Sequence, residues 1–186
     1  MLSTTDAIVL SLQPQSDKAH ILHAYTRAGG RVNYKVYGLG RKNSAEKYSP
    51  LSIVQLTTDE RSVRSAQLLF VPRSTNTDPY KRTIALFLAE VLFHVLRHPM
   101  TDEPMYAFLE QAIETLDQTD QPQNFHLSFL IAFAAKLGFA MEQEPDLPRT
   151  RKERQEVLQQ LCMYFEEHVE TWENPRSLDV LMEVFD

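Results

Sequence analysis

The residues best suited to chemistry lie between Tyr25 and Tyr48, where cations alternate with tyrosines and glycines. Cations pair with phosphate groups and release counterions, and aromatic rings stack on unpaired bases. Glycine permits tight turns and a close approach of the backbone to a ligand. The pattern favours a nucleic-acid interface, and the alternative is an ordinary hairpin with a solvated basic face. The cations are Arg27, Arg31, Lys35, Arg41, Lys42 and Lys47, and the tyrosines are Tyr25, Tyr34, Tyr37 and Tyr48.

Within this stretch, residues 31–37 alternate between apolar and polar side chains, which is typical of a strand with one buried face. Val32, Tyr34 and Val36 are expected to point into a core. Arg31, Lys35 and Tyr37 then share the opposite face. We expect these three to contact phosphates and bases. The flanking cations of the expected interface are Arg27, Arg41, Lys42 and Lys47.

The charge of the chain is divided between its two halves. Residues 1–82 hold 12 Lys and Arg against 6 Asp and Glu, whereas residues 83–186 hold 7 against 19. Such a split indicates two modules with different partners. At 186 residues the chain has room for two small domains. We expect these at residues 1–74 and 79–186.

The first module shows five short apolar segments that alternate in period two, separated by turn residues. Five strands in about seventy residues suggest a small closed barrel, because closure removes exposed sheet edges. The sequence therefore predicts an N-terminal five-stranded barrel of the oligonucleotide-binding (OB) type, with an SH3-like barrel as the alternative. The expected strands are 7–12, 19–26, 31–37, 51–57 and 67–71.

The second module is predicted to be entirely helical. Residues 74–79 are a polar linker, after which Asp78 can cap a helix that has Pro79 at its first position. Thr150 and Glu153 have the spacing of a capping box, and Ser177 can cap a last short helix. The acidic segment 142–148 is expected to be a loop. Apolar residues recur at helical spacing over 79–98, 102–116, 125–137, 150–165 and 178–185.

Other candidate chemistry is sparse, and we expect neither an enzyme nor a bound metal or cofactor. Glu90, His94 and His98 are spaced by four residues along the first expected helix, but no further ligand is implied. Cys162 is the only cysteine and falls on a buried helical face, which excludes an internal disulfide and favours an inert thiol in a reducing compartment. The sequence contains no signal peptide pattern and no apolar run long enough to span a bilayer.

Several segments, in this order and spacing, are similar to those of the RecO family of bacterial recombination mediators. The first two are the start of the chain and a His-Ala-Tyr-Thr-Arg segment that precedes Gly38, Arg41, Lys42 and Ser44. The others lie in the helical module and at the C-terminus. The matching segments are residues 5–10, 23–27, 84–92, 124–127, 137–139 and 177–185.

The resemblance implies an OB barrel, a helical domain and a cytoplasmic, nucleoid-associated role in DNA repair and recombination. It implies binding of single- and double-stranded DNA, annealing of complementary strands, and loading of recombinase onto strands coated by single-strand-binding protein, with RecR as partner. The chain is shorter than typical members, around residues 142–150 and 58–64, and has no cysteine set for the zinc site of some relatives. A protein-interaction adaptor whose barrel has lost DNA binding is the alternative, and a barrel-containing hydrolase is a weaker one.

The resemblance also implies that the helical domain binds the acidic, apolar-ended tail of single-strand-binding protein. Such a tail needs an apolar pocket rimmed by cations. Lys136 is the sole charge on the most apolar helix and is the first candidate. The second candidate is the basic cluster that includes Arg149, Arg151 and Lys152, at a helix N-terminus that favours anions.

Overall fold

A computed structural model describes residues 1–39 and 46–184 of the chain. It contains two compact units, of which the first comprises Met1–Arg73 with Leu96–Ile113 and the second comprises Ser74–Val95 with Glu114–Asp186. The first unit thus includes a helical segment in addition to the strands. The simple division into 1–74 and 79–186 remains a prediction.

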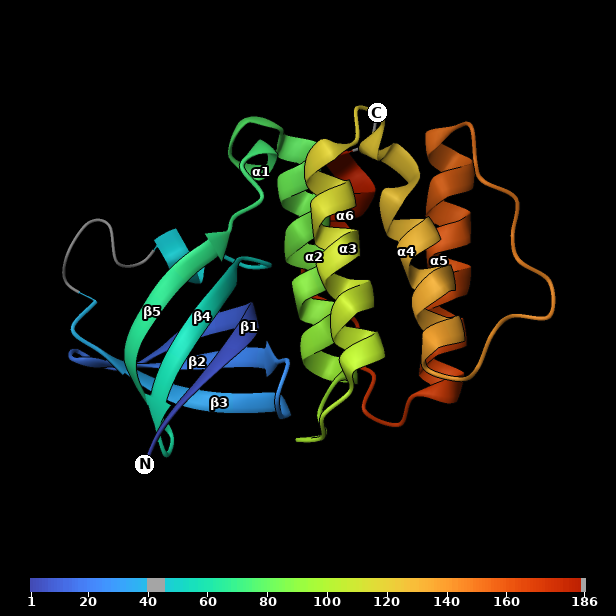
Figure 1. Cartoon of the computed structure of the whole chain (residues 1–186). Coiled ribbons are helices and arrows are strands. Elements are labelled where there is room, and N and C mark those ends of the chain that lie inside the picture. Colours follow the sequence, from blue (N-terminus) through green and yellow to red (C-terminus); the bar gives the residue numbers. More distant parts are fainter. Residues whose placement is uncertain (40–45, 185–186) are drawn as a thin grey trace. The chain divides into compact units, whose positions relative to one another are not determined.

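Five strands of the first unit close into a barrel (Figure 1). The strand order is β1-β2-β3-β5-β4, with β4 returning to β1. All neighbours are antiparallel except β3 and β5, which are parallel and meet at Lys35 and Ser62. This is the strand order of the OB barrel. The predicted five-stranded barrel followed by helices is therefore confirmed. The strands are β1 Leu2–Ser16, β2 Ala19–Thr26, β3 Gly30–Tyr37, β4 Ile53–Asp59 and β5 Ser62–Phe70.

Two strands are longer than the sequence predicted. β1 pairs with β4 from Leu2 to Ile8 and with β2 from Ala7 to Ser16, so one strand serves two neighbours. Shifts in its register between Val9 and Ser11 mark where it bends from one neighbour to the other. β5 begins at Ser62 rather than at residue 67 because pairing with β4 extends it through polar residues that show no alternation.

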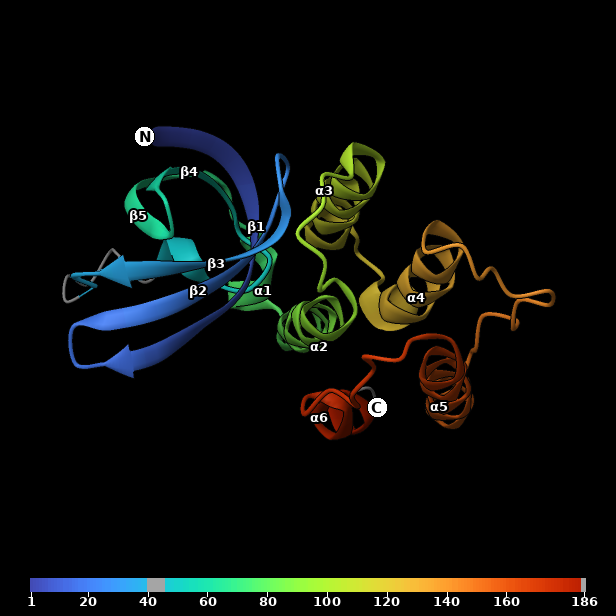
Figure 2. The same cartoon turned by 90° about the horizontal axis from the view of Figure 1, so that it is seen from below.

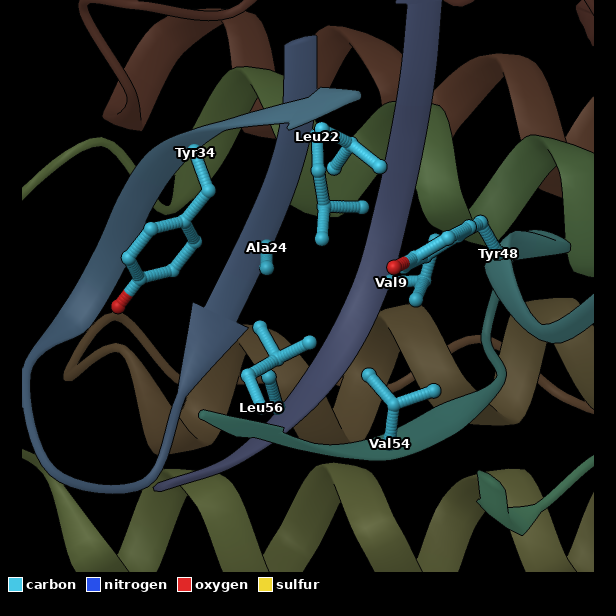
Figure 3. Packing of buried hydrophobic residues seen from close by; sticks show 9 residues of the cluster. Val9, Leu22, Ala24, Tyr34, Tyr48, Val54 and Leu56 are labelled. Atoms are coloured by element: carbon cyan, nitrogen blue, oxygen red, sulfur yellow. The ribbon is translucent and has the colours of Figure 1, made fainter. Parts of the chain in front are cut away.

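The barrel core is formed by the inward residues of the strands (Figure 3). Leu22, Ala24 and Tyr34 face Val54 and Leu56 across the barrel. Tyr48 completes this core from the short 3-10 helix η1, Glu46–Tyr48. Two of the four tyrosines in the basic stretch are thus core residues.

The helices begin where their capping residues predict. Asp78 Oδ1 accepts hydrogen bonds from the backbone N–H of Tyr80 at 2.8 Å and Lys81 at 3.3 Å. Thr150 and Glu153 form the predicted capping box. Residues 74–77 form a single helical turn rather than the expected linker. The helices are α1 Ser74–Thr77, α2 Pro79–Val95, α3 Glu103–Gln118, η2 Pro122–Asn124, α4 Phe125–Lys136, α5 Arg151–His168 and α6 Leu178–Val184.

In the second unit, α4 and α5 run parallel to each other, and the connection 137–150 returns along them (Figure 1). Figure 2, which views the helices end on, also shows α4 and α5 side by side. Near the start of both helices, Asn124 Nδ2 donates to the Pro148 carbonyl at 2.9 Å, and near their ends Tyr164 Oη donates to the Phe139 carbonyl at 3.0 Å. Phe133 stacks on Phe165 between the two helices with ring centroids 6.0 Å apart.

Within the described ranges, no helix combines the length and the apolar character that crossing a membrane requires.

Candidate nucleic-acid interface

The outer face of β3 carries the exposed part of the expected interface. Tyr34 and Val36 point into the core, whereas Lys35 and Tyr37 are exposed. Register places Lys35 opposite Ile21 and Tyr37 opposite Ala19 on β2. Tyr37 is 58% exposed, which is unusual for a large aromatic side chain. A cation and an aromatic ring therefore lie two residues apart on one open face.

Arg31 lies on the same strand but in a different environment. Its backbone N–H donates to the His98 carbonyl at 3.2 Å, and its Nη2 lies 3.2 Å from His23 Nδ1. Burial, aided by the charge of Arg97, lowers the pKa of Arg31 to about 10. Arg31 remains charged at neutral pH, but the side chain is only partly accessible to a ligand. Arg31 therefore lies at the edge of the exposed face that carries Lys35 and Tyr37.

Arg27 belongs to a separate ion-pair cluster within the first unit. Its guanidinium contacts Glu103, pairs with Glu110 at 2.9 Å and lies 4.3 Å from the ring centroid of Tyr106. Two carboxylates and one aromatic ring thus surround this cation. The structure does not bring Arg27 together with Lys35 and Tyr37.

Three of the four tyrosines are unable to stack on a base. Tyr25, Tyr34 and Tyr48 are at most 7% exposed, and Tyr25 stacks on Tyr106 with centroids 6.4 Å apart. Burial raises the pKa of both Tyr25 and Tyr48 to about 12. The burial of Tyr34 is the one that the alternation of β3 predicts, and Tyr25 and Tyr48 are likewise packing residues despite the cations around them in the sequence. Tyr37 alone of the four is exposed.

The remaining cations of the stretch are Lys47, Arg41 and Lys42. Lys47 Nζ donates to the Ala66 carbonyl at 3.3 Å and lies 5.5 Å from the Tyr48 ring centroid. The ammonium group of Lys47 is therefore already hydrogen-bonded to strand β5. Arg41 and Lys42 lie outside the described residues.

Lys18 in the β1–β2 turn and His20 at the start of β2 lie beside the end of β3, which sequence reasoning missed. Lys18 and His20 line an open groove of about 670 Å³ together with Tyr37. Arg61, at the β4–β5 turn, accepts a hydrogen bond from the Lys35 backbone N–H at 2.7 Å through its carbonyl. The sequence indicates a turn between the first two expected strands, but β1 continues to Ser16, so the turn comprises only Asp17 and Lys18. The pairing that brings this turn beside the end of β3 is not visible in the sequence.

The three possible metal ligands Glu90, His94 and His98 do not lie along one helix. α2 ends at Val95, so His98 does not lie on the same helix as Glu90 and His94. His98, which directly precedes Pro99, is restricted from helical conformation. Glu90 Oε2 instead accepts from Ser177 N and Oγ at 3.0 and 2.9 Å. No cluster of three metal-binding side chains occurs in residues 1–39 and 46–184.

Cys162 is buried, 6% exposed, as the helical pattern predicts. Burial, with the charge of Glu166, raises the pKa of its thiol to about 12. The thiolate, which is the nucleophile, is therefore scarce at neutral pH.

The cations expected to bind the acidic tail of single-strand-binding protein lie in two separate places in the second unit. Lys136 is exposed at the end of α4, whereas Arg149, Arg151 and Lys152 lie at the start of the parallel α5. Arg151 Nη2 donates to the carbonyls of Met182 and Glu183, and Lys152 lies 3.8 Å from Glu156. The two candidate sites are distinct and would not bind one short peptide together.

Comparison with known proteins decides the family. The model for "Recombination protein O C terminal" matches residues 76–146. The DNA repair protein RecO of Phocaeicola vulgatus is 36% identical over 148 residues, which cover 74% of this chain and 61% of the relative. The RecO of Christiangramia forsetii is 26% identical over an alignment that spans both chains completely. The chain belongs to the RecO family.

The RecO relatives are longer than this chain. The match covers 61% of the Phocaeicola vulgatus protein and 63% of the RecO of Porphyromonas gingivalis, which is 31% identical. The alignment to the RecO of Christiangramia forsetii has 238 positions, whereas this chain has 186 residues. That relative therefore carries segments that this chain lacks.

Proposed function

We propose that this RecO-family protein is a non-enzymatic DNA-binding mediator of recombination in DNA repair. It binds single- and double-stranded DNA, anneals complementary strands and helps load recombinase onto strands coated by single-strand-binding protein. RecR is its partner, and it acts in the cytoplasm on the nucleoid. The relatives support this proposal because they are named DNA repair protein RecO. The single observation that carries it is the exposed pair of Lys35 and Tyr37 on an OB barrel.

The proposed action follows from the chemistry of that face. Lys35 pairs with a phosphate and releases a counterion, which gives affinity without sequence preference. Tyr37 stacks on a base, which is equally tolerant of sequence because every base has an aromatic face. Neither interaction requires a covalent step. A mediator that aligns strands by charge and stacking needs no catalytic residue.

A protein-interaction adaptor is the second candidate function, and the environments of two expected DNA contacts favour it. Glu103 and Glu110 pair with Arg27, so the charge of one of the expected DNA contacts is already balanced by carboxylates of the same chain. Arg31 is also half-buried. An adaptor would retain the barrel without needing these cations. Binding of labelled DNA separates the two functions.

Replacement of Lys35 by Gln is expected to weaken binding of a labelled single strand and to flatten its salt dependence. Each phosphate contact contributes about 0.7 to the slope of log affinity against log salt concentration for single strands. The loss of one contact should lower the slope by this amount. Fluorescence anisotropy titrations across a salt series measure both quantities.

Lys152→Gln is the matched control, because it removes one exposed lysine from α5 and leaves the barrel unchanged. The control should bind like the wild type. Unchanged affinity and slope in a folded Lys35→Gln variant would move the DNA site away from β3.

We also propose that the tail of single-strand-binding protein binds near Lys136 at the end of α4. This lysine is exposed at the end of the most apolar helix, α4, beside buried Phe133. Lys136→Glu is expected to weaken binding of a tail peptide at least about tenfold, because a carboxylate contact becomes a repulsion. Calorimetric titration measures the effect.

Lys152→Glu provides the control at the opposite end of the helix pair. It makes the same charge change, so general repulsion of an acidic peptide would weaken binding in both variants. A stronger loss for Lys152→Glu than for Lys136→Glu would place the tail at the start of α5 instead.

A further inference from the structure

An open groove of about 380 Å³ runs along one face of α5 in the second unit. The connection 137–150, which passes beside α5 in Figure 1, contributes Met141 to its wall. The residues from α5 are spaced by three or four positions, so they form one continuous stripe on the helix. They are Glu156, Gln159, Gln160, Met163, Tyr164 and Glu167.

The centre of the groove is apolar although it is open to solvent. Met163 is 61% exposed, and Met141 and Tyr164 are half-buried. Methionine side chains are flexible and polarisable, so they adapt to the surface of an apolar partner. Tyr164 is fixed, because its Oη donates to the Phe139 carbonyl at 3.0 Å and its ring centroid lies 4.2 Å from that of His168. A rigid aromatic ring beside adaptable methionines is typical of surfaces that bind peptides.

The two ends of the groove are acidic. The charged side chains among the described lining residues are those of Glu156 and Glu167, and both are exposed. Lys152 lies 3.8 Å from Glu156, but an exposed pair of this kind is weak and exchanges readily for another cation. Such a groove repels phosphates and acidic peptides and attracts cations. The adjoining connection adds three exposed carboxylates, which are Glu142, Glu144 and Asp146.

We propose that this groove binds a cationic amphipathic helix of a partner protein. The eleven residues from Glu156 to Glu167 rise about 16.5 Å along α5. A partner helix that lies alongside α5 therefore carries lysine or arginine about three turns apart, where each pairs with one of the two carboxylates. Between these cations it carries apolar side chains at helical spacing, which cover Met163 and Tyr164. This binding is independent of the proposed DNA interface on β3.

The probe for this site is a synthetic helical peptide that has two arginines about three turns apart and leucines between them on the same face. A second peptide contains the same residues in scrambled order. Calorimetric titration is carried out at low and high salt. Wild-type protein is expected to bind the ordered peptide saturably and the scrambled peptide at least about tenfold more weakly, because only the ordered helix presents arginines and leucines together.

Variants separate the apolar and the charged contributions to binding. Met163→Gln is expected to weaken binding at least about fivefold at both salt concentrations, because it removes apolar contact without changing charge. Glu156→Gln combined with Glu167→Gln should weaken binding about tenfold at low salt and less at high salt, where charges are screened. Circular dichroism shows whether each variant is folded.

Glu114→Gln combined with Asp120→Asn is the matched control. It also removes two exposed carboxylates of the second unit, but these lie outside the lining of the groove. The control should bind the ordered peptide like the wild type. Equal weakening in the two double variants would instead attribute binding to the overall acidity of the unit and refute the site.

Two further results would also refute the inference. One is equal binding of the ordered and scrambled peptides, or no saturable binding of the ordered peptide by folded wild-type protein up to about 1 mM. The other is self-association of the wild-type protein alone that Met163→Gln abolishes, which would assign the groove to a second copy of this chain. Analytical ultracentrifugation measures this self-association.

Discussion

Gly30→Ala is expected to lower the free energy of unfolding of the first unit by more than about 3 kcal/mol. Gly30 has φ 63°, in the left-handed region that side chains rarely adopt. An added Cβ would overlap the carbonyl oxygen of Met100 and lie 2.8 Å from the Met100 nitrogen and the His98 oxygen. These are backbone atoms and cannot rotate away. Strain of about 1–3 kcal/mol from the dihedral adds to the cost of moving this backbone.

Substitutions at two other glycines distinguish the two contributions to that loss, the strain of the backbone dihedral and the overlap with backbone atoms. Gly38 has φ 71°, and a Cβ added there would meet no atom of the described residues within 4 Å, so Gly38→Ala should cost only the dihedral strain. Gly29 has no left-handed conformation, and its nearest neighbour would be Thr26 Oγ1 at 3.5 Å, so Gly29→Ala should be nearly neutral. Denaturant unfolding followed by circular dichroism measures all three variants. Equal losses at Gly29 and Gly30 would show that residues 98–100 do not pack on this turn.

The second unit is expected to lose about 2 kcal/mol of stability between pH 7 and pH 5 through His126. This side chain is 1% exposed, and burial, with the charge of Arg154, lowers its pKa to about 3. In the unfolded chain the imidazole binds a proton near pH 6.5. Between these values the unfolded state binds more protons than the folded state, so stability falls as the pH falls.

His126→Gln removes this titration and should reduce the pH dependence by the same amount. Trp172 is the only tryptophan of the chain and is buried in the second unit, so its fluorescence reports the unfolding of that unit. The quantity to compare is the difference between the two pH values in each protein, because the substitution also changes packing. An unaltered pH dependence in His126→Gln would contradict a neutral, buried His126.

The elements that local chemistry determines were predictable from the sequence. The helix starts at Asp78 and Thr150 follow from capping side chains that bind the backbone within three residues. The inward and outward alternation of β3 follows from the pleat of a strand. The barrel itself followed from the number and spacing of the short strands.

The candidate site was only partly predictable, because long-range packing decides which residues are available. Arg27 was expected among the DNA contacts, but Glu103 and Glu110, far later in the chain, surround it. Tyr25 resembles a stacking residue in the sequence, yet it packs against Tyr106. Conversely, the β1–β2 turn joins Tyr37 only because β2 pairs with β3. Such relations depend on tertiary contacts that no local pattern encodes.

The most direct test of the DNA interface on the outer face of β3 is photochemical cross-linking from that face. A photoreactive benzoylphenylalanine in place of Tyr37 keeps an aromatic ring at the position. The same residue in place of Met163, 61% exposed on α5, serves as control. Irradiation with a labelled single strand should cross-link the variant at position 37, unlabelled strand should compete, and the control should remain uncross-linked. A cross-link from position 163 alone, or none from position 37 under conditions where the protein binds the strand, would contradict the interface.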